Sequence, residues 1–149
     1  MTLPPLRRSV IVPLKQGPAF DLFTRRLGEW WPLASNSLAL KHAASCHLEA
    51  RLGGRIFERT AEGAESVWGT IVEWVEPERF TASWHPGRHP DSAQVLAVRF
   101  VAVGGQTRVE LEQRDWEQAG HRAEELRERN EDGWPGVLAR YELLANRKP

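Results

Sequence analysis

The sequence predicts an α+β fold in which a curved antiparallel sheet of about six to seven strands wraps around a long C-terminal helix. Between residues 47 and 114, apolar side chains recur with period two in segments roughly ten residues apart, separated by turn residues. This pattern is typical of an antiparallel meander. Residues 134–145 then place apolar side chains on one helical face. Only a strongly curved sheet folded around that last helix would cover both apolar surfaces.

The N-terminal part of the chain predicts one strand and one short helix. Residues 6–13 (LRRSVIVP) contain a β-branched run that is typical of a strand. Residues 18–26 (PAFDLFTRR) carry an apolar stripe at helical spacing, with Pro18 in the first turn and Gly28 as the stop. Residues 34–46 show no clear period and are expected to be irregular or weakly helical.

Six further strands are expected from the alternation of apolar and polar residues. They are residues 47–52, 55–60, 67–75, 79–85, 94–103 and 107–114. The pairs Gly53-Gly54 and Gly104-Gly105 mark tight turns between neighbouring strands. Clean alternation indicates a sheet with one buried face and one face in water.

The C-terminal segment reads as helix in two parts. Residues 121–131 are highly charged, and 132–136 (DGWPG) are expected to interrupt the helix, with Pro135 in the first turn of the second part. One face of that second part is apolar and includes Trp134, Val137, Leu138, Tyr141, Leu144 and Ala145.

Composition and charge limit the range of functions. The chain has 149 residues, which suits one domain over 1–149. Lys plus Arg is 20 and Asp plus Glu is 20, so the zero net charge argues against nucleic acid or an anionic membrane as partner. The single cysteine, Cys46, allows no internal disulfide and is expected to be a small buried hydrophobe. No apolar run is long enough for a signal peptide or a membrane span, so a cytoplasmic location is expected.

Short motifs along the chain resemble those of a known family. They are Trp30-Trp31-Pro32, Gly53-Gly54-Arg55, Trp68-Gly69-Thr70-Ile71-Val72, Glu76-Pro77-Glu78-Arg79-Phe80, Ser83-Trp84, Thr107-Arg108-Val109-Glu110-Leu111 and Gly133-Trp134 to Leu138. In their order and spacing, the chain resembles the START-like helix-grip (SRPBCC) superfamily, which includes START lipid-binding domains, polyketide cyclases and birch-pollen-allergen-like proteins. Within it, the chain is most similar to the bacterial group related to the activator of heat-shock-protein ATPase.

The resemblance implies a deep cavity between the curved sheet and the C-terminal helix, although members differ in ligand and activity. Two departures bear on that cavity. Family members often carry a His in the phrase L-x-H-x-G-W after the last strand, whereas this chain reads LEQRDW over 111–116, with Gln113 at the His position. Residues 117–132 are rich in Arg and Glu, so an entrance framed by them would be polar.

Aromatic residues are the main candidates for a ligand site, since the chain has seven Trp, five Phe and one Tyr. Two alternatives have equal weight: a plain aromatic core, or the wall of a small-molecule cavity. The candidate cavity residues are Trp30, Trp31, Trp68, Trp74, Trp84, Phe100, Trp134, Leu138 and Tyr141. Because adjacent side chains cannot share a face, Trp30 and Trp31 are expected to serve different surfaces, one under the C-terminal helix and one at the opening.

Charged and catalytic candidates are few. Glu58 and Arg99 are the two polar residues considered for the cavity, and the facing of each depends on strand register. If Ile56 faces inward, Glu58 does too, whereas Arg99 has the alternative of an exposed position on the convex face. No histidine pair has ligand spacing, so neither a metal site nor a cofactor is expected. No nucleophile motif is present, so catalytic residues stay unassigned.

Three functions fit this sequence. The leading one is binding of a small, largely hydrophobic molecule in the cavity. The second is an enzyme of cyclase, dehydratase or hydrolase-like type, which needs an inward-facing group such as Glu58, His47 or Arg99. The third is a chaperone-associated interaction module, which would need an exposed apolar patch or a charged docking face. A homodimer is compatible with all three.

Overall fold

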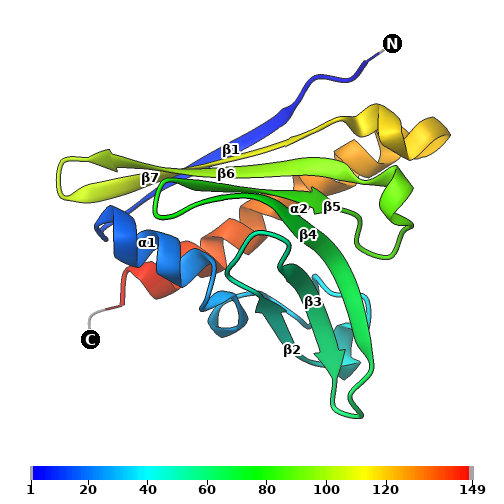
Figure 1. Cartoon of the computed structure of the whole chain (residues 1–149), viewed down its shortest axis with the longest axis horizontal. Coiled ribbons are helices and arrows are strands. Elements are labelled where there is room, and N and C mark those ends of the chain that lie inside the picture. Colours follow the sequence, from blue (N-terminus) through cyan, green and yellow to red (C-terminus); the bar gives the residue numbers. More distant parts are fainter. Residues whose placement is uncertain (1, 148–149) are drawn as a thin grey trace.

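A seven-stranded antiparallel sheet curls around a long C-terminal helix in the computed structural model, which describes residues 2–147 (Figure 1). The strands are β1 (Leu6–Val12), β2 (Ala43–Leu48), β3 (Arg55–Thr60), β4 (Glu65–Val75), β5 (Arg79–Trp84), β6 (Gln94–Val103) and β7 (Gln106–Arg114). The α-helices are α1 (Gln16–Phe23) and α2 (Ala123–Ala145). Short 3-10 helices cover Leu27–Glu29, Leu40–His42, Pro90–Ser92 and Trp116–Arg122. The predicted helix-grip fold is confirmed.

The sheet has the strand order β1-β7-β6-β5-β4-β3-β2. The six strands β2 to β7 form a meander, and β1 pairs with β7, so that Val10 lies opposite Val109. Figure 1 shows α2 crossing the concave face of the sheet, with α1 beside it at one end. The concave face is therefore shared between two helices, and this division separates the core from the candidate site.

The helix α2 runs without a break, so the interruption predicted at 132–136 is wrong. Pro135 lies inside the helix and has no N–H to donate to the carbonyl of Glu131, one turn earlier. Arg8 of β1 supplies a donor in its place, since its Nη2 donates to that carbonyl at 3.2 Å. This bond satisfies the oxygen that the proline leaves without a helical partner, and the helix continues.

Strand β2 begins four residues before the strand predicted at 47–52, and the residues that follow it form a loop. Gly53 adopts a φ of +80°, which suits glycine, and its N–H donates to Ile71 O at 2.9 Å. Leu52, an apolar residue of the strand predicted at 47–52, is 66% exposed. The apolar alternation therefore describes a strand only as far as Leu48.

Helix α1 begins two residues before Pro18 and ends at Phe23. The hydroxyl of Thr24 donates to Phe20 O at 2.7 Å, within a buried turn. The chain then tightens into a 3-10 turn over Leu27–Glu29. The helix is therefore shorter at its C-terminal end than the predicted 18–26.

An aromatic core lies where α1 packs on the sheet. The ring of Phe20 lies 5.0 Å from those of Trp74 and Phe100, and the ring of Phe23 lies 5.1 Å from that of Tyr141. Contacts of this kind between ring edges and faces are favourable at such distances. The core therefore fixes α1, α2 and the sheet relative to one another.

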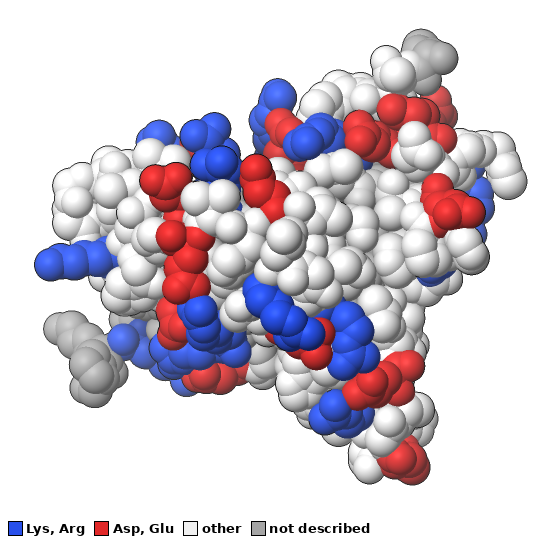
Figure 2. All heavy atoms as spheres, in the orientation of Figure 1, with Lys and Arg blue, Asp and Glu red and all other residues white. Residues whose placement is uncertain are grey.

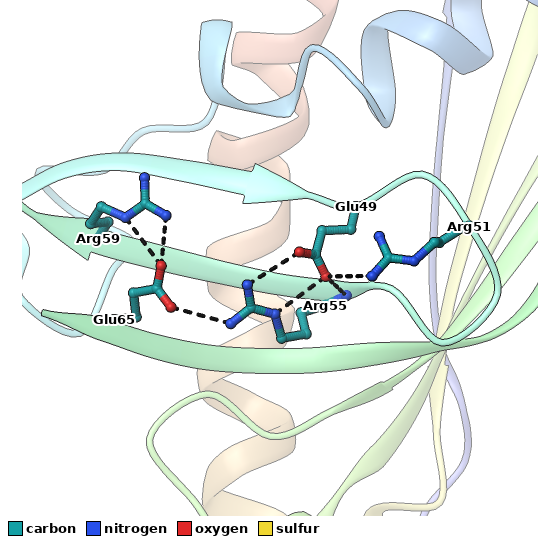
Figure 3. Close-up of polar contacts among 5 residues, drawn as sticks. All are labelled: Glu49, Arg51, Arg55, Arg59 and Glu65. Carbon is teal, nitrogen blue, oxygen red and sulfur yellow. Dashed lines mark hydrogen bonds and ion pairs between the residues drawn. The ribbon is translucent and has the colours of Figure 1, made fainter. Parts of the chain in front are cut away.

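Charged side chains cover the outer face of the sheet. Figure 2 shows acidic and basic residues next to one another on this side of the molecule rather than in single-sign regions. On β3, at the start of β4 and in the loop after β2 they form one chain of ion pairs, in the order Arg59, Glu65, Arg55, Glu49 and Arg51 (Figure 3). Neighbouring charges are thus neutralised locally, which suits a solvated face.

Candidate functional site

A partly open cavity of about 240 Å³ lies between the sheet and the middle of α2. Four tryptophan rings line it: Trp31 from the loop after α1, Trp68 from β4, Trp84 from the end of β5, and Trp134 from α2. Segments far apart in the sequence thus contribute one large ring each. The result is an aromatic wall with space beside it, the usual form of a small-molecule site.

The ring of Trp31 contacts the other three. Its centroid lies 5.1 Å from that of Trp68, 5.9 Å from that of Trp134 and 6.2 Å from that of Trp84. Its Nε1 donates to Asn36 O at 2.8 Å, which fixes the orientation of the ring. Because each indole is held by its neighbours, the wall exists before any ligand arrives, and this lowers the entropy cost of binding.

The neighbouring Trp30 serves the core instead. It is buried, its Nε1 donates to Leu22 O at 2.8 Å, and its ring lies 5.2 Å from that of Tyr141 on α2. The two adjacent tryptophans therefore point to different surfaces, Trp30 toward the helix and Trp31 into the cavity. Trp30 does not line the cavity.

The polar side chains that line the cavity are poorly suited to proton transfer. Its polar side chains are Asn36, Ser37, Arg88, Arg129 and Asn130. Within residues 2–147, no Asp, Glu, His or Cys lines the cavity. Amides, a hydroxyl and two guanidiniums donate hydrogen bonds well but are poor general acids or bases near neutral pH. The lining is thus equipped for binding and orientation.

Glu58 faces inward with Ile56 but does not line the cavity. Its side chain is almost fully buried, at 1% exposure, and it accepts three hydrogen bonds. Oε1 accepts from Trp68 Nε1 at 2.7 Å and from Leu38 N at 2.6 Å, and Oε2 accepts from Ala39 N at 2.9 Å. The carboxylate therefore ties the loop that flanks the cavity to a ring of its wall.

Arg88 lies on the loop between β5 and β6 and is held by neutral oxygen atoms. Its Nη1 donates to Ser92 O at 2.7 Å and to Ser92 Oγ at 2.9 Å, and its Nη2 donates to Gln94 Oε1 at 2.6 Å. A weaker contact joins Nη2 to Trp84 O at 3.4 Å. Partial burial lowers the pKa of Arg88, and the positive charge of Arg122 lowers it further.

Gln113, at the family's His position, holds one ring of the cavity wall, that of Trp134, by a hydrogen bond. It is buried on β7, and its Oε1 accepts from Trp134 Nε1 at 2.8 Å. Its Nε2 has no hydrogen-bond partner among the described residues. Gln113 does not line the cavity, so its contact with Trp134 is the means by which it affects the site.

The remaining predicted aromatic residues and Leu138 lie outside the cavity. Trp74 and Phe100 pack against Phe20 of α1, because that helix occupies their half of the concave face. Leu138 is buried in the core. The hydroxyl of Tyr141 donates to a carbonyl of α1 at 2.8 Å, and burial raises the pKa of this phenol. The structure thus divides the candidate set into a core group and a cavity group.

Two polar candidates lie on the outer face of the sheet. Arg99 is exposed, because its neighbours Val98 and Phe100 fill the inner face of β6. His47 stacks on the outer side against Phe57, with ring centroids 5.0 Å apart. Neither residue lines the cavity.

Sequence reasoning missed Arg88 and the cavity residues from the first half of α2. Leu126, Arg129, Asn130 and Gly133 recur at helical spacing before Trp134, so a helix continued through the proline would have placed them on the same face. Arg88 gives no such signal, because it lies in an irregular loop.

Residues 2–147 contain neither a cluster suited to a metal ion nor a helix suited to a membrane. No cluster of three or more His, Cys, Asp or Glu side chains is arranged to hold a metal ion in this part of the chain. Among the same residues, no helix combines the length and apolar character needed to cross a membrane.

The curled sheet, the long helix across it and the cavity between them define a helix-grip protein. The chain belongs to the family described as Activator of Hsp90 ATPase homolog 1-like protein, whose model matches residues 18–144. A comparison with curated proteins found no match to this chain.

Several solved structures are similar over almost the whole chain. The anthrahydroquino-γ-pyrone synthase Txn09 is 33% identical, covering 95% of this chain and 96% of that one, with a TM-score of 0.64. The self-sacrificing resistance protein CalC from Micromonospora echinospora is 29% identical, covering 96% and 94%, with a TM-score of 0.69. The Aha1 dimer from Colwellia psychrerythraea is 13% identical, covering 94% of each chain, with a TM-score of 0.65, which shows the shared fold.

Proposed function

We propose that this chain binds a small, largely hydrophobic molecule with aromatic rings in the cavity between the sheet and α2. The observation that carries this proposal is the convergence of Trp31, Trp68, Trp84 and Trp134 around about 240 Å³ of space. Flat, rigid indoles favour flat ligands, because stacking and edge contacts reward ring surfaces. The amides of Asn36 and Asn130 would orient polar substituents at the edge.

The comparisons support an aromatic ligand. Txn09, at 33% identity, is described as an anthrahydroquino-γ-pyrone synthase, a name that denotes a fused-ring product. CalC, at 29% identity, is described as a resistance protein. A synthase and a resistance protein therefore both occur among chains similar to this one, so the lining of this cavity has to indicate which kind of role fits.

Catalysis of the cyclase type is the second candidate, because Txn09 is a synthase. Its chemistry in this chain would have to use orientation and charge, since the cavity lining contains no carboxylate or imidazole within the described residues. A cavity can accelerate ring closure by holding a flexible substrate in a reactive conformation. Binding comes first in either case, so one binding experiment tests the step that the two candidate functions share.

Native mass spectrometry of freshly purified protein, compared with its denatured mass, is the first test. A retained adduct would identify the ligand class by mass. If the protein is apo, titration with the neutral fluorophore N-phenyl-1-naphthylamine follows, with saturable binding at one site per chain as the expected result. No adduct and no saturable binding by the folded protein would contradict the proposal.

A further inference from the structure

The cavity has an uneven charge. Two arginines line it, Arg88 and Arg129, and within residues 2–147 no acidic side chain does. Arg129 is neutralised, since its Nη2 lies 3.2 Å from Oε1 of Glu125 at an exposed position. No carboxylate of the described residues lies within ion-pair distance of Arg88. One positive charge at the cavity is therefore uncompensated.

The surroundings of Arg88 make this charge costly to keep. The residue is half-buried, its Nε has no hydrogen-bond partner among the described residues, and Arg122 adds a second positive charge nearby. Partial burial of a cation without a counter-ion costs folding free energy. Groups kept in such surroundings are frequently functional.

The guanidinium is also held in place in advance. Gln94, which accepts from Nη2, is fully buried, and its own Nε2 donates to Ser92 O at 3.0 Å. Ser92 accepts both bonds of Nη1, so the two acceptor residues hold each other and the arginine. The long contact of Nη2 with Trp84 O is the one an incoming acceptor can most readily replace.

We propose that Arg88 recognises an acidic group on the ligand, so that the cavity takes an aromatic acid rather than a neutral aromatic hydrocarbon. The rings would lie against the tryptophan wall, and a carboxylate, sulfonate or phenolate group would lie beside the guanidinium. This inference rests on the proposed function, since it specifies the substrate class of the same cavity. A charge-assisted hydrogen bond in a half-buried site is stronger than a neutral one.

Two fluorophores that share their ring system test the acidic group directly. 8-Anilino-1-naphthalenesulfonate carries a sulfonate, and N-phenyl-1-naphthylamine is the same molecule without it. For the wild-type protein we expect the sulfonate to tighten binding by about tenfold. In Arg88→Met the sulfonate compound should bind about tenfold more weakly than in wild type, while the neutral compound stays within roughly twofold.

A matched variant separates recognition by Arg88 from a general effect of charge. Arg51→Met removes an exposed arginine that lies outside the cavity and pairs with Glu49. It should change the affinity for the sulfonate compound by less than about twofold, since an exposed, paired charge contributes little. A loss in Arg51→Met equal to that in Arg88→Met would overturn the assignment.

The outcomes for the two proposals are distinct. Equal wild-type affinities for both compounds would overturn the acidic-group inference and leave the proposed function standing. Failure of both compounds to bind would contradict the proposed function itself. If Arg88→Met does not fold, the wild-type comparison decides alone, since it needs no variant.

Discussion

The indole N–H of Trp134 on α2 donates to Gln113 Oε1 on β7 at 2.8 Å, in a position shielded from water. This bond joins the wall of the cavity to the sheet behind it. A buried indole N–H without a partner costs free energy, so the contact fixes both the helix and the ring. The residue at the family's His position thus acts in this chain as a support.

Replacing Gln113 with Leu should destabilise the protein by about 1–3 kcal/mol, because the Trp134 N–H would lose its acceptor. Urea unfolding followed by circular dichroism measures the change in the free energy of unfolding. Gln106→Leu, at an exposed position at the start of the same strand, is the matched control and should stay within roughly 0.5 kcal/mol. Equal effects of the two substitutions would contradict the supporting role.

The buried carboxylate of Glu58 leads to a second prediction, on the loop that flanks the cavity. In Glu58→Gln, an NH₂ group replaces one oxygen and faces an N–H donor, so at least one of the three bonds is lost. We expect a loss of about 2–3 kcal/mol in stability. Amide hydrogen exchange at Leu38 and Ala39 should also become faster than in wild type.

Glu62→Gln is the control for that variant, since Glu62 is exposed on the turn between β3 and β4. It should leave both the unfolding free energy and the exchange of Leu38 and Ala39 unchanged. Unaltered exchange in a folded Glu58→Gln protein would show that the carboxylate does not hold the loop.

The division of the aromatic residues gives a third prediction. Trp84 lines the cavity, whereas Trp74 packs on Phe20 at the other end of the concave face. Trp84→Ala should weaken binding of N-phenyl-1-naphthylamine by about tenfold, and Trp74→Ala by less than about twofold. Fluorescence titration of both folded variants measures this difference. Similar losses in the two would mean that the ligand does not contact the wall formed by Trp84.

Those parts of the fold that depend on local pattern could be predicted from the sequence. Strand β3 and strand β6 have the predicted bounds, because turn and loop residues delimit each of them in the sequence. The continuity of α2 could not be predicted, because it depends on the bond from Arg8 to Glu131, whose residues lie 123 positions apart. In the sequence, Pro135 indicates a break in the helix. The hydrogen bond that allows the helix to continue is a tertiary contact, which the local sequence does not show.

The candidate site was predictable to a similar extent. Large aromatic side chains on strands and helices fit either a plain core or a cavity wall, and the rings of Trp31, Trp68, Trp84 and Trp134 line the cavity. Which rings join the wall could not be read from the sequence, because α1 fills half of the concave face. The role proposed for Arg88 could not be predicted from the sequence either. It depends on the absence of a nearby carboxylate among the described residues, and only the structure shows this.

The pH dependence of stability provides a fourth prediction, through Cys46. This thiol is buried on β2, and burial, followed by the charge of Glu58, raises its pKa from 9.0 to about 12. Because the folded state holds the proton more tightly than the unfolded state, stability is fully present below pH 9 and is lost as the pH rises toward 12. The unfolding free energy should therefore fall more between about pH 8 and about pH 10.5 in wild type than in Cys46→Ala. Urea unfolding of both proteins under reducing conditions isolates the contribution of this thiol, since all other groups are shared. Parallel pH profiles would mean that the thiolate forms in the folded protein as readily as in the unfolded chain, contrary to its buried position.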